Sequence, residues 1–456
     1  MDHAPSYREH MRAILALGLP LIGSQIAQFA IHMTDTLMLG WYDVRALAAV
    51  TLASSYWFVL FITGAGFGLA VAPMVAAAEA RGDITRARRV TRMGLHASLA
   101  YGALVLPLML WAAPVLRALG QEAHLANLAE SYLRIAAWGI FPALGVMVLK
   151  NYLAALENTR VILLVTLSAV AMNALMNYAL IFGRWGAPEL GVRGAAIASV
   201  IVNAASFLAL ALHAGRSFPE HALFTRFLRP DPEALRDIFR LGWPIGLTNL
   251  AETGLFTASA VMVGWLGTEA LAAHGIALQA AALAFMVHVG LSSAATVRAG
   301  NAIGRGDLRR LGDGAKVVIA FSLGFALIVI ALFIALPEQI ISLFLDPGDP
   351  ARPVVIAIGR ELLIVAAVFQ LADAMQVLAL GLLRGIGDTR MPMLIATLAY
   401  WVLGLGTGYG LGIVAGFGAV GVWLGLVVGL AVAGGLLMWR FWYLVAQRER
   451  QAIAGT

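Results

Sequence analysis

The sequence contains no cysteine and few charged residues. None of its 456 residues is cysteine, and charged residues make up only 12% of the chain. Disulfides, thiolate chemistry and cysteine-ligated metal centres are therefore excluded. A soluble domain carries about twice this fraction of charge. Because hydrophobic residues make up 61% and the mean hydropathy is +0.85, the chain is predicted to lie in a membrane.

Long polar stretches are also missing. The longest, residues 216–240, is a connector and not a soluble domain. Twelve apolar runs fill the rest, several of them longer than the roughly 20 residues that cross a bilayer. Gly and Pro occur in these runs, and polar and apolar residues do not alternate, which favours helices over a barrel. The runs are residues 13–41, 46–78, 91–116, 127–152, 161–183, 191–214, 238–266, 270–299, 314–342, 357–383, 391–411 and 418–446.

Positive charge is distributed unevenly between the two sides of the predicted membrane. With a cytoplasmic N-terminus, the even-numbered connections and both tails hold 24 Lys and Arg, and the odd-numbered connections hold the other 7 of the 31. This asymmetry follows the positive-inside rule and predicts that both termini are cytoplasmic. The net charge of +6 is thus a topology signal, and no nucleic-acid partner is expected. The first run has no cleavage-site pattern and is interpreted as an uncleaved span.

The chain is internally duplicated. Residues 241–273 match residues 17–49 without a gap, at a constant shift of 224 positions (241 minus 17), and the matches include Pro20 and Pro244. Polar turn residues keep the same register, which composition alone would not produce. The aligned turns are Arg81-Gly82-Asp83 and Arg305-Gly306-Asp307. We therefore predict two pseudo-symmetric six-helix bundles, residues 1–228 and 229–456. Parallel repeats of this kind have their axis along the membrane normal and the substrate site between the halves.

Three acidic residues lie away from the ends of their apolar runs. Asp35 is in the first run, Glu252 near the middle of the seventh, and Asp373 in the tenth. A charged side chain near the bilayer centre costs roughly 2.5–3.5 kcal/mol, so intramembrane acids indicate function. A solvated position near the outer end of its run is an alternative for Asp35. Since no basic residue lies deep within a predicted run, the cavity should attract organic cations, protons or Na⁺.

Two amides follow the same helical face in the fifth run. Asn173 and Asn177 are spaced i, i+4, so both side chains project from one side of the helix. Two amide oxygens with a carboxylate form an oxygen ligand set suited to Na⁺ or to a proton site. Hydrogen bonding between helices is an equally good explanation of the pair.

Other function classes lack the residues they need. There is no Asp-rich metal pair, no His-Glu-x-x-His and no nucleophile beside a histidine, so a membrane-embedded enzyme is not expected. A flippase for lipid-linked oligosaccharides would need cationic residues in its cavity to hold a pyrophosphate. A metabolite exporter of the same fold stays open as an alternative.

Taken together, these motifs resemble the multidrug and toxic compound extrusion (MATE) transporters over essentially the whole chain. The resemblance rests on the paired Leu-Gly-x-Pro openings, the Asn173 and Asn177 pair, and the three buried acids. Glu252 together with Asp373 is similar to the NorM-type branch. The resemblance implies an all-α protein of twelve transmembrane helices that exports cationic drugs in exchange for Na⁺ or H⁺.

The resemblance also implies roles for particular residues. Asp35, Asn173 and Asn177 would form a cation-coupling site in the first bundle, and Glu252 with Asp373 a cation and substrate site in the second. Either set would be the place for Na⁺. Pro20 matches the proline at which the first helix of the family bends. Where some NorM-type proteins have tyrosine one turn before the tenth-span acid, this chain has a phenylalanine. The residues expected to line the second site are Phe369, Gln279 and Phe285.

The surroundings of the protein follow from the same resemblance. No cofactor is expected beyond the coupling ion, Na⁺ or H⁺. The partners would be small organic cations and the lipid bilayer, and the protein would be a monomer. It would be a multi-pass protein of the bacterial cytoplasmic membrane.

Overall fold

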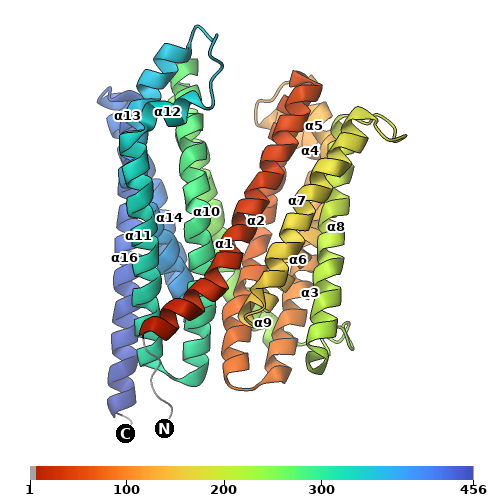
Figure 1. Cartoon of the computed structure of the whole chain (residues 1–456). Helices are drawn as coiled ribbons and strands as arrows, with labels where there is room; N and C mark the ends of the chain where they lie inside the picture. Colours follow the sequence, from red (N-terminus) through yellow and green to blue (C-terminus); the bar gives the residue numbers. More distant parts are fainter. Residues whose placement is uncertain (1–6, 455–456) are drawn as a thin grey trace. The chain divides into compact units, whose positions relative to one another are not determined.

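A computed structural model describes residues 7–454 and is helical throughout, without β-strands in that part of the chain (Figure 1). The helices of the first half are α1 (Tyr7–Tyr42), α2 (Val44–Ala80), α3 (Ile84–Leu110), α4 (Ala112–Ala118), α5 (Ala123–Ala136), α6 (Ile140–Ala155), α7 (Thr159–Phe182) and α8 (Val192–Ser217). Those of the second half are α9 (Pro232–Gly264), α10 (Thr268–Arg305), α11 (Leu308–Ala335), α12 (Pro337–Ser342), α13 (Arg352–Gly385), α14 (Arg390–Leu398), α15 (Leu405–Tyr409) and α16 (Gly418–Ala454). The short 3₁₀ and π-helical segments are η1 (Ala137–Gly139), η2 (Pro219–His221), η3 (Ala399–Gly404) and η4 (Gly410–Val414).

The predicted all-α membrane fold is confirmed. In the described residues, eleven helices or helix pairs are long and apolar enough to cross a bilayer, and each coincides with a predicted run. The twelfth run corresponds to α9, a single helix of 33 residues that is not among the eleven. Polar residues such as Asn249 and Glu252 lower its hydropathy. Large apolar side chains such as Leu104 and Val402 lie 73% and 62% exposed, as lipid-facing positions do.

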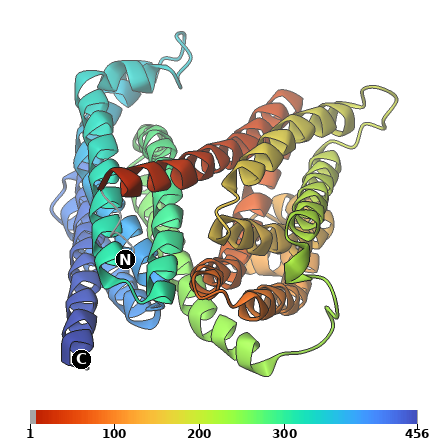
Figure 2. The same ribbon diagram turned by 60° about the horizontal axis from the view of Figure 1, so that its bottom comes forward.

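Two compact units divide the chain. One consists of residues up to Ile22 together with those from Leu247 onward, and the other is Gly23–Gly246. In the first unit α10, α11, α13 and α16 pack side by side, and in the second α2, α3, α6, α7 and α8 do so (Figures 1 and 2). Helices α1 and α9 each contribute to both units, because the boundaries fall inside them. The predicted boundary at 228/229 separates the two copies of the duplicated sequence. In the structure the units exchange their first helical segments: the first segment of each copy belongs to the unit that holds most of the other copy.

The two exchanges occur at equivalent positions of the duplication. Ile22 and Gly246, the last residues of the exchanged segments, are themselves 224 positions apart. Each segment crosses the second helix of its unit at a glycine. A Cβ on Gly66 would stand 2.3 Å from the Gly242 carbonyl oxygen, and a Cβ on Gly290 would stand 2.7 Å from the Ile22 Cα. Gly66 and Gly290 are again 224 apart, so the duplicated glycines allow the same close backbone contact in both units.

The turn before the third helix of each unit is also duplicated. Asp83 caps α3 by accepting a hydrogen bond from the Arg86 N–H at 2.8 Å, and Asp307 caps α11 by accepting one from the Arg310 N–H at 2.8 Å. These are N-caps that satisfy otherwise unpaired N–H groups of a first helical turn. The repeated Arg-Gly-Asp is thus a structural turn in both copies.

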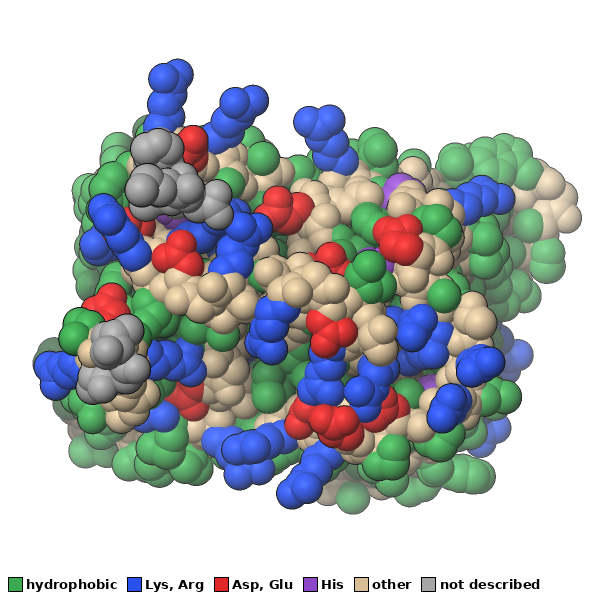
Figure 3. Space-filling model, turned by 90° about the horizontal axis from the view of Figure 1, so that it is seen from below, with side chains coloured by type: hydrophobic (Ala, Val, Ile, Leu, Met, Phe, Trp, Pro, Cys, Tyr) green, Lys and Arg blue, Asp and Glu red, His purple; other side chains and the backbone are tan. Residues whose placement is uncertain are grey.

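Ion pairs hold the first turns of α9 against α3. Arg86 pairs with Asp237, and Arg89 pairs with Asp231 and with Glu233 at 2.8 Å. The hydrogen bonds from Arg89 lower the pKa of Asp231 to about 2, so this contact is ionic at neutral pH. Lys and Arg side chains lie interspersed with Asp and Glu over this end of the molecule (Figure 3).

The equivalent contact in the other unit has different chemistry. The Tyr7 hydroxyl donates a hydrogen bond to Asp313 at 3.2 Å. Tyr7 takes the place of Asp231 in the duplication, and Asp313 takes the place of Arg89, each at the shift of 224 positions. The first turns of α1 are therefore held on α11 by a phenol and a carboxylate. The duplication has kept the place of the contact and replaced its charges.

Candidate functional site

The acid of the first half is held by the two amides predicted to accompany it. Helix α1 carries Asp35, and α7 carries Asn173 and Asn177 on one face. The Asp35 Oδ1 accepts hydrogen bonds from the Nδ2 atoms of Asn173 and Asn177 at 3.0 and 2.6 Å. Both amides are fully buried, and Asp35 is half-buried. The i, i+4 spacing on α7 thus places both amides against one carboxylate.

The orientation of these amides differs from the expected set of three oxygen ligands. Their nitrogens face Asp35, because a carboxylate can only accept hydrogen bonds. The Asn173 Oδ1 accepts a further bond from Asn177 Nδ2 at 3.3 Å. The Asn177 Oδ1 is buried and has no hydrogen-bond partner in the described structure. It is therefore the amide oxygen with free capacity for a cation or a proton donor.

The neighbours of Asp35 on its own helix are engaged elsewhere. The hydroxyls of Thr34 and Thr36 donate to the backbone oxygens of Ala30 and His32, each at 2.9 Å. Such bonds back to the preceding turn are usual for Thr inside a helix. The polar Thr-Asp-Thr segment therefore contributes only its carboxylate to the cluster.

The acids of the second half lie close together in the other unit. Glu252 on α9 is half-buried, and Asp373 on α13 is buried with 2% exposure. The two carboxylates are close enough for their charges to interact. In the described structure, Glu252 Oε1 and Asp373 Oδ1 are both buried without a hydrogen-bond partner. Unpaired carboxylate oxygens in an apolar surrounding are costly unless a cation or proton reaches them.

A tyrosine that sequence reasoning did not single out completes this cluster. The Gln376 Nε2 donates to the Tyr400 hydroxyl at 2.5 Å, and both side chains are fully buried. Tyr400 interacts electrostatically with Glu252 and Asp373. It lies in η3, a π-helical segment, and such segments are frequent at functional sites. In an apolar run, no sequence signal distinguishes a functional tyrosine from one that only packs against its neighbours.

One basic side chain reaches the acids from the end of its span. Arg384, assigned from the sequence to the end of its run, donates to the Asn249 Oδ1 at 3.1 Å and interacts electrostatically with Glu252. It lies in the last turn of α13, and a long side chain can reach back along its helix. Lys150, near the end of its predicted run, is half-buried on α6 in the other unit.

Aromatic rings surround the predicted Phe369. Its ring is 2% exposed and makes edge contacts with Phe256 at 6.1 Å and Trp423 at 5.5 Å between centroids. Phe369 precedes Asp373 by one turn, so this cluster adjoins the carboxylate. Gln279 is exposed on α10, and Phe285 is half-buried on the same helix. Their role in the site stays a prediction.

The predicted helix-bend residue lies in a continuous helix. Pro20 is inside α1, as Pro244 is inside α9. Each proline lies two residues before the last residue of its exchanged segment, Ile22 for Pro20 and Gly246 for Pro244. A proline removes one backbone donor from a helix and so allows bending there, and a bend at Pro20 stays a prediction.

Comparison with known proteins gives a consistent result. The family model MatE matches residues 20–179 and 244–409, one match in each copy of the duplication. "Probable multidrug resistance protein NorM" of Agrobacterium fabrum is 44% identical over 449 residues, which cover 98% of this chain and 97% of that protein. The protein of the same name from Rhizobium meliloti is 46% identical over 445 residues, 96% of this chain and 95% of its own length.

Solved structures share the fold at low sequence identity. A crystal structure of MATE in complex with MaL6 has a TM-score of 0.88 at 21% identity and covers 97% of both chains. A MOP superfamily transporter from Pyrococcus furiosus has a TM-score of 0.85 at 22% identity, over 96% of this chain and 97% of its own. Since the family matches occupy both halves and the relatives align over nearly the full length, the chain belongs to the MatE family of membrane transporters and is not an enzyme.

Proposed function

We propose that this chain is a secondary antiporter that exports lipophilic organic cations in exchange for Na⁺ or H⁺. The relatives named multidrug resistance protein NorM support export of drugs and toxic compounds. The observation that carries the proposal is the pair of buried acids, Glu252 and Asp373, each with a carboxylate oxygen that has no partner in the described structure. Such a pair attracts cations and releases them when it is neutralised.

Competition for these carboxylates provides the mechanism. An organic cation binds the ionised acids, and its apolar body contacts the aromatic cluster around Phe369. When Na⁺ or H⁺ binds the same carboxylates, the charge that held the organic cation is neutralised and the cation leaves. The phenol of Tyr400 and the amide of Gln376 position Glu252 during this exchange. Arg384 balances part of the negative charge from the side of Asn249.

Asp35 is the second coupling acid in this proposal. The amides of Asn173 and Asn177 hold the carboxylate in one orientation, and the unpartnered Asn177 Oδ1 adds an oxygen ligand for Na⁺ or an acceptor for a protonated group. One cation entering down a potential of about 100 mV provides roughly 2.3 kcal/mol. A tenfold concentration gradient adds about 1.4 kcal/mol.

The charge around the buried acids separates this function from its alternatives. For the Pyrococcus furiosus transporter, a reversed polarity of the binding pocket suggests a different function for that protein. The fold alone therefore does not determine the cargo. A carrier of pyrophosphate-linked lipids would need several unpaired cations. Here Arg384 lies beside Glu252, which compensates its charge.

The wider setting is part of the same proposal. The chain would act as a monomer in the bacterial cytoplasmic membrane, with both termini in the cytoplasm. The distribution of Lys and Arg supports this orientation.

Transport by purified protein in liposomes tests the proposal. Efflux of a fluorescent organic cation is measured under an imposed Na⁺ gradient and, separately, a pH gradient. We expect one gradient to drive efflux, and Glu252→Gln or Asp373→Asn to reduce the rate about tenfold or more, which corresponds to about 1.4 kcal/mol. Glu269→Gln, an exposed acid on α10, is the matched control and should leave efflux unchanged.

Two outcomes would contradict the proposal. Full activity in both variants would remove these carboxylates from the mechanism and leave Asp35 as the coupling acid. If no organic cation moves under either gradient, drug export is wrong, and anionic lipid carriers and metabolites become the substrates to test.

A further inference from the structure

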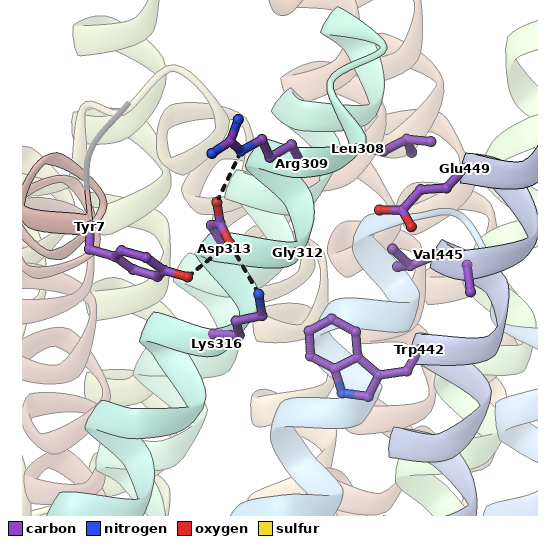
Figure 4. A pocket seen from close by; sticks show the side chains of 10 residues that line it. Tyr7, Leu308, Arg309, Gly312, Asp313, Lys316, Trp442, Val445 and Glu449 are labelled. Atoms are coloured by element: carbon purple, nitrogen blue, oxygen red, sulfur yellow. Dashed lines mark hydrogen bonds and ion pairs between the residues drawn. The ribbon is translucent and has the colours of Figure 1, made fainter. Parts of the chain in front are cut away.

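A pocket of mixed charge lies at the end of the unit where α1 begins and α16 ends (Figure 4). It has a volume of about 680 Å³ and is open to the outside. One wall is formed by the first turns of α11, and the other by the last turns of α16, while Tyr7 of α1 closes one side. The transport proposal uses none of these residues. The residues used below are Arg309, Asp313 and Lys316 on α11 and Trp442, Val445 and Glu449 on α16.

The aromatic residues of α16 place this pocket at the membrane–water boundary. Trp439 and Tyr443 are 64% and 52% exposed, and their rings stack with centroids 5.5 Å apart. Exposed Trp and Tyr at the end of a transmembrane helix mark the depth of the lipid headgroups. Trp442 lies between them in sequence and lines the pocket. The pocket is therefore at the level where phospholipid headgroups meet the protein.

The α11 wall carries an excess of positive charge. Asp313 accepts hydrogen bonds from the Tyr7 hydroxyl and the Lys316 Nζ, both at 3.2 Å, and lies 3.9 Å from the Arg309 Nε. One carboxylate thus orients two cations. The Arg309 and Lys316 side chains remain 80% and 58% exposed. A guanidinium has five N–H donors and an ammonium three, so both retain donors for an anionic ligand.

The α16 wall carries the opposite charge. Glu449 is exposed and forms no hydrogen bond or ion pair with any described residue. Its carboxylate points toward the pocket across from α11 (Figure 4). Val445 and the indole of Trp442 line the same wall. The pocket therefore presents donors on one side, an unpaired acceptor on the other, and apolar surface between them.

We propose that this pocket binds the headgroup of an ethanolamine phospholipid. The phosphate would accept hydrogen bonds from Lys316 and Arg309, which are the groups that bind phosphate in proteins. The ammonium would donate to Glu449. A glycerol-type headgroup carries a net negative charge and no ammonium, so Glu449 would repel it. A choline headgroup has no N–H to donate to the carboxylate. The apolar wall accommodates the glycerol backbone, which free phosphoethanolamine lacks.

Native mass spectrometry of the purified full-length protein tests the site. The protein is delipidated and mixed with equal amounts of phosphatidylethanolamine, phosphatidylglycerol and phosphatidylcholine. We expect the ethanolamine lipid to be retained about fivefold to tenfold more than either competitor, because two charge-assisted contacts distinguish it. Glu449→Gln should abolish this preference and increase retention of phosphatidylglycerol. Lys316→Gln combined with Arg309→Gln should lower retention of all three lipids.

A matched control and a soluble probe separate the explanations. Arg360 and Glu338 form an exposed ion pair at 3.1 Å near the start of α13, so Arg360→Gln and Glu338→Gln remove the same charges outside the pocket and should leave the lipid preference unchanged. Soluble phosphoethanolamine should compete only weakly. Equal retention of the three lipids by the unmodified chain would overturn the proposal. So would a preference that persists in Glu449→Gln, or full competition by soluble phosphoethanolamine. These readouts do not depend on transport, so the proposal stands or falls independently of the proposed antiport.

Discussion

At the scale of single residues, the buried acids differ in how their charges are supported. Asp35 has two amide donors at hydrogen-bonding distance. Asp373 has an oxygen with no partner in the described structure, and its neighbour Glu252 carries a like charge. The first acid is preorganised, whereas the second pair depends on what binds to it. We therefore expect substitutions beside the second pair to change the affinity for cations most strongly.

Tyr400→Phe tests the support of the second pair. Without the hydroxyl, the buried Gln376 amide loses its acceptor, which costs about 1–3 kcal/mol, and the amide becomes free to turn away from Glu252. We expect the Na⁺ or H⁺ concentration for half-maximal efflux to change about fivefold. Tyr409→Phe is the control, since Tyr409 is 49% exposed on the same span. A variant that lowers only the thermal unfolding temperature, with unchanged cation dependence, would make Tyr400 a packing residue.

The candidate site could be predicted where one helix supplied the spacing. Asn173 and Asn177 repeat after one turn, so their shared direction follows from the sequence alone. Tyr400 and Arg384 could not be identified in the same way. Tyr400 approaches the acids through a π-helical segment, and the Arg384 side chain reaches back along α13 toward Asn249. Neither displacement can be deduced from the order of residues.

At the scale of helices, the exchanged first segments of α1 and α9 are held by close backbone contacts. Both rest on a glycine of the next helix, Gly290 for α1 and Gly66 for α9. The sequence predicted long helices through both boundaries but not the exchange, because an apolar helix shows no change in pattern where it passes from one unit to the other. The duplicated glycines were visible in the sequence, yet their partners were not.

Gly290→Ala should destabilise the protein because its Cβ would overlap backbone atoms of Ile22. Overpacking of this kind costs about 1–3 kcal/mol. Gly275→Ala on the same helix is the control: nothing lies within 4 Å of its Cβ, and a helical Gly to Ala change gains about 0.5–1 kcal/mol. Thermal unfolding in detergent should therefore rank Gly275→Ala above the unmodified chain and Gly290→Ala below it. Equal unfolding temperatures for the two variants would show that the crossing can relax.

At the scale of the whole molecule, the duplication has kept the fold and separated the chemistry of the two halves. The position equivalent to Asp35 is Ser259, whose hydroxyl donates to the Leu255 carbonyl of its own helix. The position equivalent to Glu252 is Gln28. Each unit therefore carries its acid where the other has a neutral residue. We therefore expect two different sites in the two copies of the duplication. A substitution that inactivates one site should not have the same effect on transport as a substitution that inactivates the other.

The orientation of the whole chain is directly testable because it contains no cysteine. Single cysteines at Glu220, between α8 and α9, and at Gly348, between α12 and α13, both lie at exposed positions. Three predicted spans, α9, α10 and α11, separate them, so they should face opposite sides of the membrane. In intact cells, a membrane-impermeant maleimide should label Gly348→Cys but not Glu220→Cys, and permeabilised cells should label both. The unmodified chain provides a background without labelling.

The same experiment decides whether α9 crosses the membrane. If it does not, two spans separate the introduced cysteines, and both label from the same side. If α9 does cross but the chain is inverted, Glu220→Cys labels in intact cells and Gly348→Cys does not. Only the first pattern would contradict twelve spans. Either pattern would contradict two cytoplasmic termini, because a chain of eleven spans has its ends on opposite sides of the membrane. We expect neither, because a helix of 33 residues exceeds the length needed to cross a bilayer, and Lys and Arg are concentrated on the side of Glu220.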